Sequence, residues 1–152
     1  MQTLVKPNPR SRAAYDDDLA LWIDEQIQLL VEARYSELDV EHLVGELESM
    51  KNSEVRELKN RLRVLIMHLL KCQFQPEHYK GRWHATLCEQ RLQLNDLLLS
   101  SPSLRRKVAE FAAHGYRVAV KRAACETHLP VSAFPNENPY TVEQILDQEF
   151  TP

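Results

Sequence analysis

The feature that most constrains this chain is a long amphipathic stretch between Ser53 and Gln75. Its apolar residues are spaced alternately three and four apart, so they form one stripe along a helix. The stripe consists of Val55, Leu58, Leu62, Leu65, Leu69 and Cys72. Further apolar residues lie off the stripe in the second half, namely Val64, Ile66, Met67 and Leu70. Apolar residues on more than one side predict the central rod of a helical bundle.

The rest of the chain also favours an all-α fold. The 152 residues include only three glycines, and the alternation of polar and apolar residues that is typical of strands is absent. Helices are expected at about residues 16–34, 39–50, 53–75, 82–100 and 101–128, with a short last helix after Thr141. Asp39 is the expected N-cap of the second helix, and a break is favoured at Lys51-Asn52.

These elements predict an antiparallel up-and-down bundle of four to five main helices, closed by a short C-terminal helix. Thr141 and Gln144 form a capping box for that last helix. We expect residues 1–14 to be a disordered tail and residues 15–152 to be a single domain.

We expect the apolar residues of the first two helices to face the core. They are Leu19, Trp22, Ile23, Ile27 and Leu30, followed by Leu43, Val44, Leu47 and Met50. In the fifth helix most residues of the inward face are small, which predicts a closely approaching neighbour. That face consists of Leu104, Val108, Ala112, Gly115, Ala119 and Ala123.

The order of several segments points to a family. They are YDDDLALWIDEQIQLL, LVGELESM, RLRVLIMHLLKCQFQP, RWHATLCEQR and FPNENPYTVEQILDQEF. From about Tyr15 to Pro152 the chain resembles the bacterial domain of unknown function numbered twenty-nine. The resemblance implies a small, helical, up-and-down bundle with no assigned activity. Cys72 stands where an aromatic residue is more usual in that family, so a function built on this thiol would not be a family function.

The net charge of -3 conceals a strong asymmetry. Residues 16–50 contain eleven acidic residues and one basic residue, whereas residues 51–107 contain twelve basic and five acidic residues. The simplest interpretation is that acidic helices pack beside basic ones.

Composition also bears on the compartment. The three cysteines are an odd number and lie in helical segments, which favours free thiols in a reducing cytoplasm. No apolar run approaches the roughly 18 residues of a membrane span, and the first residues lack the apolar core of a secretory signal.

Two histidine–cysteine pairs suggest a metal site. His68 and Cys72 are four residues apart, as are His84 and Cys88, so each pair shares a helix face. An antiparallel hairpin would bring both pairs to the same level, where two imidazoles and two thiolates suit tetrahedral zinc. The alternative is that no cofactor is bound and Cys72 is a small hydrophobic residue of the stripe.

Polar residues within the helical pattern suggest a polar core or functional site. Candidates are Glu46, Glu48, His68 and Arg91. Inward carboxylates and histidines can build metal or acid–base sites, but the Glu-x-x-His spacing of di-iron bundles is missing. We therefore expect Arg91 to pair with a carboxylate of the acidic second helix.

Basic clusters raise nucleic-acid binding as a second alternative. They comprise Arg56, Lys59, Arg61 and Arg63, and separately Arg105, Arg106 and Lys107. Interleaved Glu54 and Glu57 and a pI of about 6.1 count against a one-signed phosphate-binding surface.

No pattern indicates an enzyme, because no glycine-rich turn exposes a nucleophile or cradles a phosphate. The favoured hypothesis is a non-enzymatic protein-interaction module that pairs with a second copy of itself as a homodimer or with another protein. The first alternative is a zinc-binding bundle with hydrolytic activity.

Overall fold

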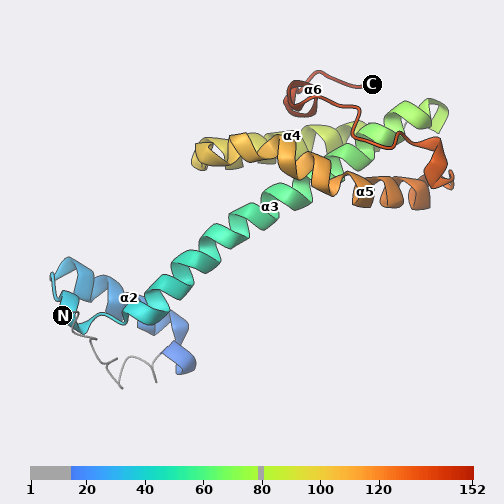
Figure 1. Cartoon of the computed structure of the whole chain (residues 1–152). Helices are drawn as coiled ribbons and strands as arrows, with labels where there is room; N and C mark the ends of the chain where they lie inside the picture. Colours follow the sequence, from blue (N-terminus) through green and yellow to red (C-terminus); the bar gives the residue numbers. More distant parts are fainter. Residues whose placement is uncertain (1–14, 79–80) are drawn as a thin grey trace. The chain divides into compact units, whose positions relative to one another are not determined.

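The computed structural model of the chain describes residues 15–78 and 81–152, and every regular element within them is helical (Figure 1). The order is α2 (Leu19–Val31), η1 (Tyr35–Glu37), α3 (Val40–Phe74), η2 (Pro76–His78), α4 (Gly81–Ser100), η3 (Pro102–Lys107), α5 (Val108–Thr127), η4 (Val131–Ala133) and α6 (Val142–Leu146), where η denotes a 3₁₀ helix. The predicted all-α bundle is confirmed. The predicted disordered tail, residues 1–14, lies outside the described residues.

The chain divides into two compact units, the first ending at Asn52 and the second beginning at Ser53. The expectation of a single domain stays a prediction. Within the described ranges, no helix has both the length and the apolar character needed to cross a membrane.

α3 is one continuous helix of 35 residues that contributes to both units. The expected break at Lys51-Asn52 is therefore wrong, because both residues are helical and neither is a proline or glycine that would interrupt the hydrogen bonds. At its start the carboxylate of Asp39 accepts a hydrogen bond from the backbone N–H of His42 at 3.4 Å, as expected of an N-cap.

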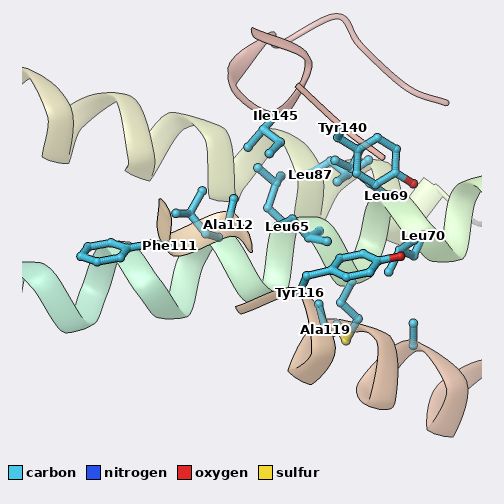
Figure 2. Close-up of a cluster of buried hydrophobic side chains, with 14 of the residues drawn as sticks. Leu65, Leu69, Leu70, Leu87, Phe111, Ala112, Tyr116, Ala119, Tyr140 and Ile145 are labelled. Carbon is cyan, nitrogen blue, oxygen red and sulfur yellow. The ribbon is translucent and has the colours of Figure 1, made fainter. Parts of the chain in front are cut away.

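The leucine stripe forms the core of the second unit. Leu58, Leu62, Leu65 and Leu69 have no exposed surface, and Cys72 is buried beside them. α4 returns along α3 and α5 runs back beside them (Figure 1). Figure 2 shows Leu65 and Leu69 of α3 in one cluster with residues of α4, α5 and the C-terminal segment: Leu87, Tyr116, Ala119, Tyr140 and Ile145. The predicted central rod is confirmed.

α5 is held close to α3 by its small residues. Gly115 is buried, and a Cβ at this position would lie 3.0 Å from Cγ of Arg63 in α3. The helix begins later than predicted, because residues 102–107 form η3. Ser101 occupies the N-cap position of η3, but its hydroxyl donates to the carboxylate of Glu54 and makes no capping hydrogen bond.

The C-terminal segment closes the bundle of the second unit, as predicted for its short last helix. The predicted capping box is confirmed: the Thr141 hydroxyl accepts from Gln144 N at 3.2 Å, and Gln144 Oε1 accepts from Thr141 N at 2.9 Å. Phe134 and Ile145 are buried in the core cluster.

We predict that Leu62→Ala lowers the free energy of unfolding by about 2 to 5 kcal/mol, because it leaves a cavity in a fully buried row. Urea denaturation monitored by circular dichroism measures this loss. Leu99→Ala, at a site that is 78% exposed, is the matched control and changes stability by no more than about 0.5 kcal/mol. Equal losses in the two variants would contradict the placement of the core.

Candidate interaction site

Asp39 holds α2 against the start of α3. Its buried carboxylate accepts from Trp22 Nε1 at 3.3 Å and contacts His42 Nδ1 at 2.7 Å, while its backbone N–H donates to Gln26 Oε1 at 2.8 Å. Burial alone would raise the pKa of Asp39, but the hydrogen bonds from His42 and Trp22 outweigh it and hold this pKa below its ordinary value. A buried carboxylate requires such donors, so α2 turns Trp22 inward, and Gln26 lies on the same side to accept from the Asp39 N–H.

This orientation leaves most apolar residues of the first unit on the outside. The buried residues of α2 are Trp22, Gln26 and Leu29. The predicted inward faces are wrong for Leu19, Ile23, Ile27, Leu30, Val44, Leu47 and Met50, all of which are exposed. The physical reason is that the hydrogen-bonding needs of Asp39, rather than apolar area, decide which side of α2 faces α3.

The exposed apolar residues line a hollow of about 200 Å³ in the first unit. We call it the first-unit groove, defined by Trp22, Ile23, Gln26, Ile27, Leu30, Leu43, Glu46, Leu47 and Met50. Leu47 is 63% exposed and Met50 is 66% exposed. Apolar patches of this kind mark interaction sites more often than isolated exposed leucines do.

Of the two glutamates expected in a polar core, only Glu46 reaches the groove. Its Oε1 accepts a hydrogen bond from the Tyr15 hydroxyl at 2.6 Å. This hydrogen bond to a carboxylate raises the pKa of Tyr15, because it favours the protonated phenol. Glu48 is exposed to solvent.

The groove also contains an unsatisfied polar group. Gln26 is 1% exposed, and its Nε2 has no hydrogen-bond acceptor among the described residues. Its Oε1 accepts from the Asp39 N–H, which fixes the orientation of the amide. A buried donor without an acceptor costs about 1 to 3 kcal/mol, so an acceptor for this N–H would stabilise the protein.

The four residues predicted to bind zinc are only partly brought together. His84 Nε2 lies 3.5 Å from Cys88 Sγ, and Cys72 and His84 line one open hollow of about 360 Å³. Nδ1 of His68 instead lies 2.9 Å from the Val64 carbonyl oxygen. Across residues 15–78 and 81–152, no group of three or more His, Cys, Asp or Glu side chains is placed to hold a metal ion. Zinc binding stays a prediction.

Burial governs the ionisation of the first histidine–cysteine pair. It raises the pKa of the Cys72 thiol to about 11, so the thiol is neutral at physiological pH. Burial also lowers the pKa of His68, more than the hydrogen bond to the Val64 carbonyl raises it. Neutral Cys72 therefore packs as a small apolar residue of the leucine stripe.

Arg91 is 1% exposed, but the predicted pairing with a carboxylate of the acidic helix is wrong. Its guanidinium donates to three backbone carbonyls: Nε to Ile145 at 3.0 Å, Nη1 to Phe150 at 2.8 Å and Nη2 to Gln144 at 3.0 Å. Carbonyls at the end of α6 have no helical partners, so they can satisfy the buried cation. Arg91 thereby anchors the C-terminal segment to α4.

Some of the basic residues considered for nucleic-acid binding are engaged within the second unit. Nζ of Lys59 lies 4.6 Å from the centroid of the Phe111 ring, and Arg61 pairs with Glu57 at 2.8 Å. Arg56 is exposed. The nucleic-acid alternative stays a prediction.

Sequence reasoning assigns Asp39 only a capping role and does not single out Gln26. The sequence feature that could have indicated the groove is the number of apolar residues in the acidic segment, residues 16–50. α2 and the start of α3 carry more apolar residues than they can bury between them when one side of α2 is occupied by polar contacts.

We predict that Arg91→Met lowers the free energy of unfolding by about 2 to 4 kcal/mol, because one buried and two partly buried carbonyls lose their donor. Chemical denaturation measures the loss. Arg82→Met, at an exposed site of the same helix, is the control and is expected to be nearly neutral. An unchanged free energy of unfolding in Arg91→Met would show that these three hydrogen bonds do not contribute to stability.

We predict that His68→Gln weakens the dependence of stability on pH below 6.5. The pKa of His68 is lower in the folded chain than its ordinary value of 6.5, so the unfolded chain binds more protons as the pH falls. In the wild type, the stability that neutral His68 contributes is fully present above pH 6.5. It is lost as the pH falls from 6.5 toward the lower pKa of His68 in the folded chain. Denaturation at several pH values measures the slope, and the exposed His114 provides the control variant His114→Gln.

Comparison with known proteins bears on the identity of the chain. A family model described as "Domain of unknown function DUF29" matches residues 14–151. No curated protein and no solved structure matches the chain. Because the match spans nearly the entire sequence, including parts of both units, the chain belongs to the family of the domain of unknown function DUF29.

Proposed function

We propose that the protein is a non-enzymatic interaction module that binds another protein chain through the first-unit groove. The observation that carries this proposal is the exposure of large apolar side chains around the groove, including Ile27, Leu47 and Met50. In the free protein these side chains face water. A partner that covered the exposed half of each would gain about 1 kcal/mol per side chain.

The size of the groove supports a macromolecular partner. Its volume of about 200 Å³ lies below the range of roughly 300 to 1,000 Å³ that is typical of small-molecule pockets. It suits one or two anchoring side chains of a protein segment, with the surrounding apolar residues excluding water.

We also propose that the protein works in a reducing compartment such as the cytoplasm. All three cysteines are free, and Cys125 is exposed. Free exposed thiols are ordinary in reducing compartments and uncommon where disulfides form.

We predict that the double variant Ile27→Ser/Leu47→Ser loses its partner while keeping its fold. Both side chains are exposed, so the free energy of unfolding should change by no more than about 1 kcal/mol in total. The measurement is affinity purification of the tagged full chain from the cells that encode it, with quantitative mass spectrometry and sedimentation at micromolar concentration. We expect at least a tenfold loss of co-purified partner, or of dimer if the partner is a second copy.

The matched control is Leu99→Ser/Val118→Ser, which removes two exposed apolar side chains from the second unit. It is expected to bind as the wild type does. Equal recovery of every partner by the groove variant and the wild type would contradict the proposed function.

A further inference from the structure

We propose that the occupant of the first-unit groove is a cationic amphipathic helix from another protein. This inference rests on the proposed function and names the chemistry of the partner. It is carried by the combination of an apolar groove, acidic residues along its edges and the unsatisfied amide of Gln26.

The charge of residues 16–50, which include every residue of the first-unit groove, is almost entirely of one sign. Residues 16–50 contain eleven acidic residues, and their single base is Arg34. Arg34 is already paired with Glu32 at 2.8 Å and with Glu37 at 2.7 Å. A field of this sign attracts a cationic partner and accelerates its association.

Acidic residues border the apolar rows of both helices. In α3, Glu41 lies three residues before Val44 and Glu48 lies four residues after it, so all three share one face of the helix. This face borders the apolar row that contains Leu47. In α2, Asp24 lies three residues before Ile27, so it borders the apolar row of that helix in the same way. The side chains of Asp24, Glu41 and Glu48 are exposed, so they remain available to a partner.

An apolar groove formed by two helices and edged with carboxylates matches a helix with apolar residues on one side and lysine or arginine on the flanks. Helices bind such grooves through residues spaced three, four and seven apart. A partner helix would pack between the rows of α2 and α3, over the groove that contains Gln26. A small shift of Gln26 would then let its Nε2 donate to an acceptor of the partner, which removes the cost of the unsatisfied group.

A second copy of the chain fits this surface less well. Symmetric pairing through the groove would place Asp24, Glu41 and Glu48 of one protomer near the same acidic residues of the other. Like charges opposed across an interface are strongly unfavourable. Charge complementarity therefore favours a cationic helix over self-association.

The test measures binding of the full chain to fluorescein-labelled synthetic peptides by fluorescence anisotropy. The probe is a helix of about eighteen residues with leucine along one side and lysine elsewhere, long enough to be helical when bound. One comparison peptide has glutamate in place of lysine. Another has the leucine and lysine residues in scrambled order, so that it keeps the charge and lacks an apolar side.

We expect the cationic amphipathic probe to bind with a dissociation constant in the micromolar range, more weakly as salt is raised. Ile27→Ser/Leu47→Ser and Asp24→Asn/Glu41→Gln/Glu48→Gln should each weaken binding by about tenfold or more. The control Asp96→Asn/Glu137→Gln/Glu149→Gln changes three exposed acidic residues of the second unit and should bind as the wild type does.

Several results would overturn the proposal. Equal binding of the scrambled probe would show general charge attraction, and equal binding of the glutamate peptide would show an apolar site without charge preference. A dimer that dissociates in the groove variant would assign the groove to a second copy, and displacement of the probe by a peptide of residues 1–14 would assign it to the chain's own N terminus. Equal binding of the glutamate peptide, or a dimer that depends on the groove, would leave the proposed interaction function standing with a different partner. Displacement by the peptide of residues 1–14 would mean that the groove holds a segment of the same chain. The interaction function itself fails only if partner recovery does not depend on Ile27 and Leu47.

Discussion

Burial of the leucine side of α3 against α4 and α5 is the interaction on which the second unit depends. Leu58, Leu62, Leu65 and Leu69 are completely removed from water, and α5 comes close enough to bury them because Gly115 and its neighbouring alanines present little bulk. The C-terminal segment then covers the same core with Ile145. Apolar burial therefore accounts for the second unit.

The first unit, which includes the start of the same helix, is organised by polar contacts and not by apolar burial. Asp39 caps α3 and draws Trp22 and Gln26 toward its buried carboxylate and backbone N–H. These polar contacts determine the rotation of α2, so most of its large aliphatic residues, though not Leu29, remain in water. A fold that satisfies a polar group at the expense of apolar burial is typical of surfaces that are completed by binding.

The parts of the fold that sequence predicts well are those governed by short-range patterns. The leucine spacing places the core of α3 correctly, and Thr141 with Gln144 places the start of α6. The faces of α2 and the partner of Arg91 are not predictable in this way. They depend on which distant backbone groups need a hydrogen-bond donor or acceptor, and periodicity carries no information about that. For the same reason, the groove appears only when the rotation of α2 is known.

The way Arg91 holds the C-terminal segment has a consequence for how this sequence can change. All three of its hydrogen bonds end on main-chain oxygens, so the anchor recognises the path of the backbone and is indifferent to the side chains at 144, 145 and 150. As far as the anchor is concerned, substitutions at these positions are tolerated as long as the chain keeps its course. A single arginine thus fixes the path of this segment without specifying its side chains, and the identities of Gln144 and Ile145 are constrained only by the capping box and the core.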